Sequence, residues 1–121
     1  MICHITTKND WEKAQNEGEY KIPSLESEGF IHCSTIQQTV ETANNFFRGQ
    51  LNLVLLCIDE NKLDAELLYE DPMPVGGQKP NASAVSKYPH VYGVINLSAV
   101  INVIDFFPDS NGEFRLPKEL G

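Results

Sequence analysis

Hydrophobic and polar positions at the start of the chain predict a strand followed by a helix. Residues 1–6 are mostly apolar and fit a strand. Thr7, followed three residues later by Asp10, resembles the capping signal that opens a helix, because both side chains can satisfy backbone N–H groups of the first turn. The predicted helix runs to about Glu17 and stops at Gly18, since glycine readily adopts the left-handed conformation found after a helix.

The same succession of strand and helix repeats in the next segment. A polar loop at 23–28 precedes a predicted strand at 29–33. Ser34 or Thr35 then caps a second helix, with a glutamine three residues further on as its reciprocal partner, and Gly49 closes it. The apolar residues of this helix recur at helical spacing and are Ile36, Val40, Ala43 and Phe47.

Strands dominate the second half of the chain. Residues 51–58 are nearly all apolar, as expected of a strand that is buried on both faces. Residues 71–89 are rich in proline, glycine and small polar residues and show no periodicity, so we expect a long, mobile loop that acts as a lid near the site. The remaining predicted elements are a turn at 59–64, a strand or a helix at 65–70 with the strand favoured, a strand at 91–95, a brief helical turn at 97–100 and a strand at 101–107.

The order of these elements predicts an α+β fold. Strand and helix alternate only in the first half, which argues against a doubly wound parallel sheet. The chain contains neither Gly-x-Gly-x-x-Gly nor a phosphate-binding loop that ends in Lys-Ser/Thr, so the common nucleotide fingerprints are absent. A chain of 121 residues without an internal repeat is expected to form one domain over residues 1–121, with a C-terminal extension at about 108–121.

Charge and composition exclude several kinds of partner. The net charge is −8 and the nine lysines and arginines are scattered, so we expect no binding to nucleic acid or to an anionic membrane, both of which are polyanions. No apolar run reaches the roughly 18 residues of a membrane span. No signal peptide is visible, and Cys3, Cys33 and Cys57 each lie in an apolar run. Buried, reduced thiols and a cytoplasmic location are therefore expected.

The candidate chemistry comes from three histidines, each of which lies in a short strand-like stretch. They are His4, His32 and His90. Successive side chains on a strand point to opposite faces, so a polar residue between apolar neighbours can be held in a cleft. We therefore predict that the three imidazoles converge on one cleft between two β-layers.

Hydroxyl-bearing side chains accompany these histidines. Two positions after each histidine, on the same face of its strand, comes a hydroxyl residue, which gives the pairs His4 and Thr6, His32 and Ser34, and His90 and Tyr92. Imidazole titrates near neutrality, so His32 and His90 are candidate acid–base groups, with Tyr92 as a further proton donor. Glu70 is the only carboxylate in a strongly patterned segment. It is either a further catalytic group or a solvated charge at a strand end.

A series of short motifs runs through nearly the whole chain. They are His4-Ile5-Thr6, Trp11 with Ala14, Gly18 with Tyr20, Ser24-Leu25, residues 28–34, Gln38, Phe46-Phe47, residues 53–58, Tyr69-Glu70 and residues 89–93. Over residues 2 to about 104, in type and in order, they resemble the bacterial family known as domain of unknown function 952 (DUF952).

The DUF952 family in turn resembles, more distantly, the ADP-ribosyltransferase fold, in which a split β-sheet binds NAD in the cleft between two half-sheets. This resemblance implies that His4 contacts a ribose and that a helix led by Ser34 carries an aromatic residue, Phe46 or Phe47, that stacks on nicotinamide. Thr6, beside His4, is a further candidate to hold ribose or phosphate oxygens. The implied ligand is NAD or ADP-ribose, and the implied activity is ADP-ribosyl or phosphoryl transfer or hydrolysis.

The chain departs from the transferases at a late strand. Many of them place a glutamate there to stabilise a cationic transition state, whereas the corresponding strand of this chain opens with His90-Val91-Tyr92. Glu70 on another strand is the candidate replacement. The related RNA 2′-phosphotransferases use histidine and arginine, but an acidic chain with two arginines fits an RNA substrate poorly.

Two other kinds of function use the same residues. Three imidazoles with an open fourth position suit catalytic zinc. No CxxC, HExxH or HxH spacing supports a zinc site, however, so no metal ligands are assigned. Alternatively, the chain is a non-catalytic module that retained nucleotide or partner binding and lost the chemistry, which the missing late-strand glutamate favours.

Overall fold

The strand β5 (Leu53–Ile58) is buried along its whole length and forms the centre of the fold. Because side chains alternate across a strand, β5 contributes to a hydrophobic core on each of its faces. Val54, Leu56 and Ile58 belong to one core, and Leu53, Leu55 and Cys57 belong to the other. The prediction of a strand buried on both faces is confirmed, with a start two residues later than expected.

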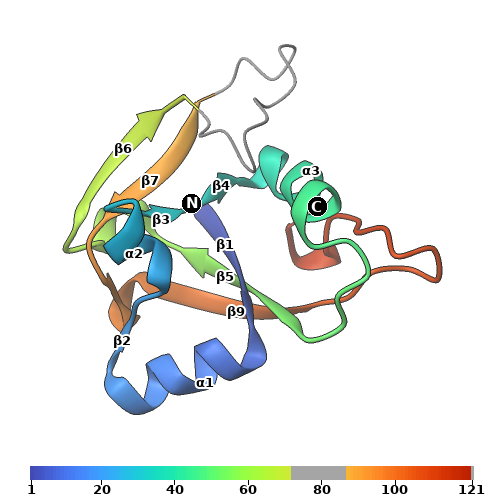
Figure 1. The fold of residues 1–121 in the computed structure, drawn as a ribbon, viewed down its shortest axis with the longest axis horizontal. Coiled ribbons are helices and arrows are strands. Elements are labelled where there is room, and N and C mark those ends of the chain that lie inside the picture. Colours follow the sequence, from blue (N-terminus) through green and yellow to red (C-terminus); the bar gives the residue numbers. More distant parts are fainter. Residues whose placement is uncertain (72–86, 121) are drawn as a thin grey trace.

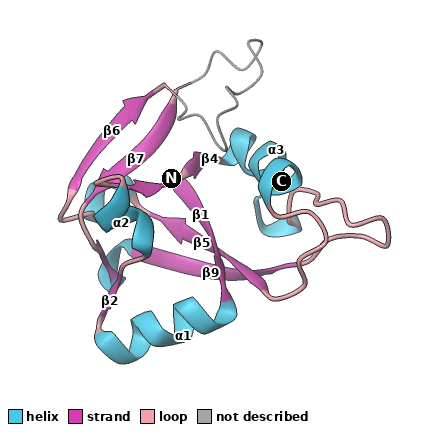
Figure 2. Cartoon of the chain, viewed as in Figure 1, coloured by secondary structure: helices cyan, strands magenta, loops and turns pink. Residues whose placement is uncertain are grey.

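The structure is a computed structural model that describes residues 1–71 and 87–120, and these residues form three antiparallel sheets (Figures 1 and 2). The four-stranded sheet has the order β4 (Ser34–Thr35), β1 (Ile2–Thr7), β5 and β9 (Val100–Phe106). The three-stranded sheet has the order β3 (Ile31–His32), β7 (Tyr88–Tyr92) and β6 (Glu66–Glu70), and β2 (Glu19–Tyr20) pairs with β8 (Ile95–Asn96). The mixture of helices and antiparallel sheets confirms the α+β class.

The helix α1 (Lys8–Glu17) begins and ends where the sequence predicts. The hydroxyl oxygen of Thr7 accepts a hydrogen bond from the backbone N–H of Asp10, at 3.0 Å. Gly18 follows the helix with a φ of 86°, a left-handed conformation that residues with a Cβ adopt at a cost. In Figure 1, α1 lies below the four-stranded sheet, near the end of β1 that leads into it.

The helix α3 (Ile36–Phe46) has the predicted capping box, formed by Thr35 and Gln38. The hydroxyl of Thr35 accepts from the backbone N–H of Gln38, and the amide oxygen of Gln38 accepts from the backbone N–H of Thr35. The helix ends at Phe46, so the prediction that Gly49 closes it places the end too late.

The segment expected to be a polar loop at 23–28 instead contains a short helix, α2 (Pro23–Ser27). Proline suits the first turn of a helix because its fixed φ is helical and its missing N–H has no partner there in any case. The late strands also differ from prediction. The segment expected at 91–95 consists of β7, which starts at Tyr88, and the separate strand β8, which pairs with β2.

The C-terminal extension packs against α3 and the second core. Phe114 is buried and lies 4.7 Å from Phe106 between ring centroids. The side chain of Asn44 on α3 donates a hydrogen bond to the carbonyl of Phe114 and accepts one from its N–H, at 3.2 and 2.7 Å. These paired bonds hold the extension in register with α3. Figure 1 shows the C-terminus beside this helix.

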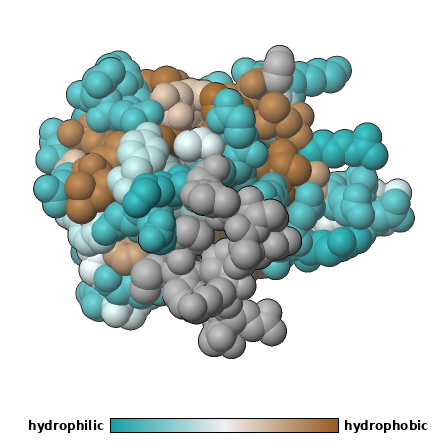
Figure 3. Space-filling view, turned by 90° about the horizontal axis from the view of Figure 1, so that it is seen from above, coloured by the Kyte–Doolittle hydropathy of each residue, from teal (hydrophilic) through white to brown (hydrophobic). Residues whose placement is uncertain are grey.

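The predicted lid at 71–89 lies mainly outside the described residues, and its last two positions belong to β7. Of the helices in the described ranges, none has the length and apolar character that a membrane crossing requires. On the face seen in Figure 3, polar residues are interspersed with apolar ones, as expected of a chain with many surface charges.

Gly93 directly follows β7 and Ala65 directly precedes β6, and the close approach of these two residues can be tested. A Cβ at this position would lie 2.8 Å from the Cβ of Ala65. We expect Gly93→Ala to lower the free energy of unfolding by about 1–3 kcal/mol, because neither backbone can move freely. In the double variant with Ala65→Gly most of this loss should be recovered. Urea unfolding of the two single variants and the double variant measures the coupling, and a Gly93→Ala protein as stable as wild type would contradict the packing described here.

Candidate functional site

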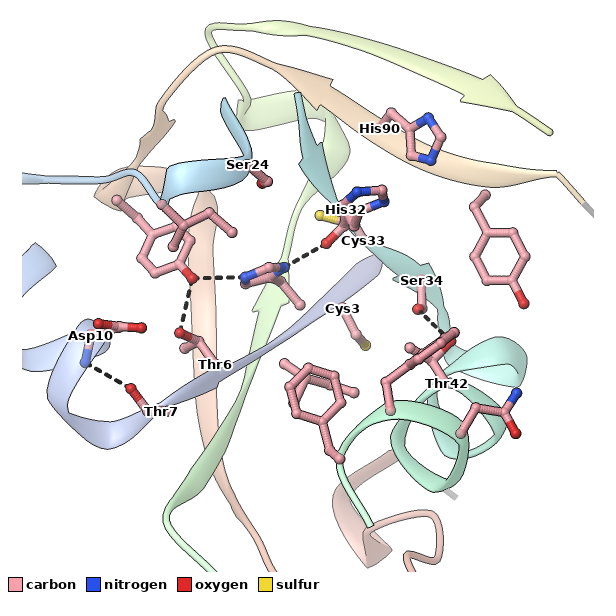
Figure 4. Close-up of a pocket in the computed structure, with 18 of the residues that line it drawn as sticks. Cys3, Thr6, Thr7, Asp10, Ser24, His32, Cys33, Ser34, Thr42 and His90 are labelled. Carbon is pink, nitrogen blue, oxygen red and sulfur yellow. Dashed lines mark hydrogen bonds between the residues drawn. The ribbon is translucent and has the colours of Figure 1, made fainter. Parts of the chain in front are cut away.

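A cavity of about 520 Å³ lies along one edge of β1, and we call it the β1 pocket (Figure 4). The strand β4 pairs only with Ile2 and Cys3. Beyond these residues no described strand continues the sheet on that side. The cavity is lined by β1 together with residues from α1, α2, α3, β2, β3, β4 and β7. Its volume lies within the range of small-molecule sites, roughly 300–1,000 Å³.

Seven of the nine residues predicted for the site line the β1 pocket. They are His4, Thr6, His32, Ser34, Phe46, Phe47 and His90. The other two, Glu70 and Tyr92, line a second hollow of about 390 Å³, to which His90 also contributes. The structure therefore brings the three histidines together and connects the remaining two residues to them through His90.

His4 is buried and both of its ring nitrogens are hydrogen-bonded within the protein. Nδ1 lies 2.6 Å from the backbone carbonyl oxygen of His32, and Nε2 lies 2.7 Å from the hydroxyl of Tyr20. That hydroxyl is also 2.9 Å from the hydroxyl of Thr6. Figure 4 shows this chain of bonds running from Thr6 to the carbonyl of His32. Because the strands that carry His4, Tyr20 and His32 belong to three different sheets, His4 links all three.

The bonds of His4 determine where its proton resides. A carbonyl oxygen only accepts, so Nδ1 carries the hydrogen. Burial lowers the pKa of His4 to about 4, and the ring is therefore neutral near pH 7, with Nε2 as an acceptor. The hydroxyl of Tyr20 donates to Nε2, which leaves the hydroxyl of Thr6 to donate to Tyr20. Burial likewise raises the pKa of Tyr20, so this hydroxyl keeps its proton.

His32 forms a carboxylate–imidazole pair with Glu28 at the end of α2. Its Nε2 lies 2.7 Å from the carboxylate oxygen Oε2, and the side chains are 41% and 37% exposed. An ionised carboxylate only accepts, so Nε2 carries the hydrogen. Nδ1 of His32 has no hydrogen-bond partner among the described residues and remains available to a ligand in the pocket.

His90 forms a second pair of the same kind, with Glu70 on the neighbouring strand β6. Its Nδ1 lies 2.9 Å from Oε1 of Glu70, and the hydroxyl of Tyr92 donates to the same oxygen. The hydrogen bonds from Tyr92 and then from His90 lower the pKa of Glu70, and the bond to Glu70 raises the pKa of Tyr92. The His90 ring is 2% exposed, whereas the Glu70 side chain is 38% exposed. Glu70 thus connects a buried imidazole to solvent.

The two pairs face each other across paired strands. His32 on β3 and His90 on β7 are direct partners in the register, with ring centroids 5.3 Å apart and planes at 82°. Phe30 packs against both rings, stacked on His90 at 4.1 Å and edge-on to His32 at 4.8 Å. The Phe30 ring therefore holds both imidazoles in place. Figure 4 shows His32 and His90 side by side.

The helix α3 supplies the opposite wall of the pocket. The hydroxyl of Ser34 lies 3.2 Å from that of Thr42. The Phe46 side chain is 51% exposed at the pocket, whereas Phe47 is partly buried against the second core. Phe46 therefore has the free ring face that stacking requires, and Phe47 contributes mainly to packing.

Several residues of the site did not stand out in the sequence. Tyr20 and Glu28 complete the hydrogen bonds of His4 and His32, and Phe30 packs against His32 and His90. Tyr20 was noted only as part of a motif. Glu28 lies only four residues before His32, but no helix spans the two positions, so the spacing does not predict their contact. For Tyr20, whose partner is distant in sequence, no local pattern exists.

A three-histidine zinc site does not fit this geometry. Both nitrogens of His4 are occupied by protein groups. No cluster of three or more His, Cys, Asp or Glu side chains within residues 1–71 and 87–120 is arranged to hold a metal ion. The three cysteines are buried and free, as expected.

The chain matches one protein family and has close structural neighbours. The model of the family described as protein of unknown function (DUF952) matches residues 5–103. The crystal structure of protein CC0527 from Caulobacter crescentus is similar at 32% identity and a TM-score of 0.81, and the match covers 98% of this chain and 96% of that one.

Two further structures of CC0527 are similar as well. The crystal structure of a double mutant of that protein shares 31% identity with a TM-score of 0.80, over 98% of this chain and 96% of that one. The solution NMR structure shares 28% identity with a TM-score of 0.69, over 98% and 94%. No curated protein matches the chain.

The buried, neutral His4 predicts a specific pH dependence. Its pKa is about 4 in the folded protein and 6.5 in an unfolded chain. The unfolded state therefore binds more protons between these values, and stability falls as the pH falls from about 6.5 to 4, by roughly 3 kcal/mol in total. In NMR titrations the His4 ring resonances should stay constant from pH 8 to pH 5.

Urea unfolding provides the control for this prediction. His4→Gln removes the titrating ring, so its stability should depend less on pH than that of wild type over the same range. Carboxylates are common to both proteins and cancel in the comparison. A His4 resonance that titrates with a midpoint near 6.5 would show that the ring is solvated and the hydrogen-bond network incorrect.

Proposed function

We propose that this chain, which belongs to the DUF952 family, is an enzyme that binds a small hydroxyl-bearing molecule in the β1 pocket and transfers protons with His32 and His90. The observation that supports this most is the pair of carboxylate–imidazole units that meet across β3 and β7 at the pocket wall. Carboxylates orient imidazoles and stabilise their protonated form, which is what acid–base catalysis needs.

The two histidines suit complementary roles. Each donates one ring N–H to its glutamate and keeps the other nitrogen without a partner among the described residues. One imidazole can remove a proton from an attacking water or hydroxyl while the other donates a proton to the leaving group. Glu70 acts as a positioning residue for His90, and Tyr92 shares the same carboxylate oxygen.

The narrower form of the proposal is a ligand related to NAD or ADP-ribose. It rests on the resemblance to ADP-ribosyltransferases and on three features of the pocket. The hydroxyls of Ser34 and Thr42 suit ribose oxygens, the half-exposed Phe46 ring offers a stacking face, and Glu70 brings a carboxylate beside a strand that lacks one. Of the two reactions that the resemblance implies, attack on the anomeric carbon is the one we propose.

His4 and Thr6 have a different role in this proposal from the one that the resemblance implies. Their polar atoms already bond to Tyr20 and to the backbone of His32. They therefore hold the pocket floor in place, and ligand contacts fall to groups with free atoms. His4 acts through the position of β3, on which His32 lies.

Turnover and binding are tested together with NAD, ADP-ribose and nicotinamide riboside as probes. Calorimetry measures binding, and chromatography measures products. We expect His32→Gln and His90→Gln each to lower kcat by about 10²–10⁴-fold, the usual contribution of a general acid or base. Binding should change much less, because glutamine keeps a polar group of similar size. Circular dichroism verifies that both variants fold.

Glu66→Gln is the matched control for Glu70→Gln, because both residues lie on β6 and only Glu70 contacts His90. The first should leave turnover unchanged, and the second should lower it. Binding of a probe without any product would identify a binding module in place of an enzyme. If no probe binds at millimolar concentration, the NAD-like ligand is wrong.

A further inference from the structure

We infer that the β1 pocket selects ligands whose buried part is uncharged or cationic and keeps phosphate groups outside. This inference rests on the proposed function and specifies its ligand class. It comes from the charges around the cavity, which are independent of any assignment of catalytic roles. The unpartnered nitrogens of His32 and His90 are suited to hydroxyl or carbonyl groups of such a ligand.

The charged residues that line the pocket are acidic. Asp10 at the start of α1 and Glu41 on α3 both line it, and both side chains are exposed at its rim. Of the lining residues in the described part of the chain, none is lysine or arginine. Among the described residues, a phosphate group in this cavity would therefore meet two carboxylates and no fixed cation.

The histidines do not reverse this balance. His4 is neutral near pH 7, since burial lowers its pKa to about 4. His32 and His90 are each paired with a glutamate, so even when protonated each pair sums to zero charge. Asp10 and Glu41 then remain uncompensated in either protonation state.

The fields of these two carboxylates reach the pocket lining. Burial, and after it the charge of Glu41, raises the pKa of Tyr88, another lining residue. Asp10 is among the causes of the raised pKa of Tyr20. Like charges in a partly desolvated cavity repel more strongly than in bulk water.

The N-termini of α1 and α3 at the pocket are capped, and α2, which has no side-chain cap, is only five residues long. An anion could otherwise be held by the free backbone N–H groups of a first turn. In α1 the N–H of Lys8 donates to Asn52 and that of Asp10 to Thr7. In α3 the capping box occupies the N–H groups of Thr35 and Gln38. A nucleoside, or the cationic nicotinamide riboside end of a dinucleotide, fits these constraints, with any phosphates directed out of the pocket.

Matched ligands provide the first test. Nicotinamide riboside and nicotinamide mononucleotide differ only by a phosphate, so their affinities isolate the effect of its charge. We expect the riboside to bind at least about tenfold more tightly at low ionic strength, a difference that salt should diminish by screening. Glu41→Gln and Asp10→Asn should each strengthen mononucleotide binding. Glu12→Gln, an exposed α1 residue outside the pocket lining, is the control for the same change in net charge.

A chemical probe tests the pocket potential without any assumption about the ligand. Asn45→Cys places a thiol in the lining, and Gln15→Cys places one on the exposed surface of α1. Each variant is labelled in separate reactions with two methanethiosulfonate reagents, one that carries a cationic trimethylammonium group and one that carries an anionic sulfonate group. Peptide mass spectrometry distinguishes the introduced thiols from the three native ones. The rate ratio of cationic to anionic reagent should be about tenfold larger for Asn45→Cys, since steering follows the local potential. Addition of Glu41→Gln should reduce it.

The two experiments separate the two proposals. Equal labelling ratios at the two sites, or a mononucleotide that binds as tightly as the riboside, would overturn the charge inference. If neither nicotinamide ligand binds but the labelling ratios differ as expected, the NAD-like ligand fails and the selection for uncharged or cationic molecules stands.

Discussion

The neutral imidazole of His4 is the interaction on which the rest of this structure depends. It lies on β1, accepts from Tyr20 on β2 and donates to the backbone of His32 on β3. Those strands belong to three different sheets. A single buried ring therefore joins them, and it does so only while uncharged, because protonation would remove the acceptor that Tyr20 requires. Low-dielectric burial keeps the ring in that state.

This constraint explains why the pocket and the two carboxylate–imidazole pairs lie side by side. β4 pairs with only the first two residues of β1, so the remaining edge borders a cavity in place of a neighbouring strand. The His4 bond then fixes β3 at the far wall, where His32 faces His90 across the register. Phe30 holds both rings, and the glutamates come from α2 and β6, outside the cavity. Asp10 and Glu41 lie at the rim of the cavity, and the two paired imidazoles line its wall.

The local features of this fold were predictable because their signals are local. Thr7 and Thr35 mark helix starts through side-chain bonds to backbone groups three residues away. The α2 helix was missed because proline signals both a helix start and a loop. The predicted site residues lie at two adjoining hollows around His90. Which of their polar atoms are already hydrogen-bonded within the protein had no local signal. The sequence could not show that Tyr20 and the His32 carbonyl already occupy His4.

By itself the sequence determined the central buried strand, the capped helices, the α+β class and the strand positions of the three histidines. These depend on periodicity and on contacts a few residues apart, which composition and spacing encode directly. Only the tertiary structure decided which histidine has both ring nitrogens hydrogen-bonded and which keep one nitrogen without a partner among the described residues. It also decided which carboxylates face the cavity. Such properties depend on partners up to 28 residues away for His4 and 20 for His90, and on burial that no single segment specifies.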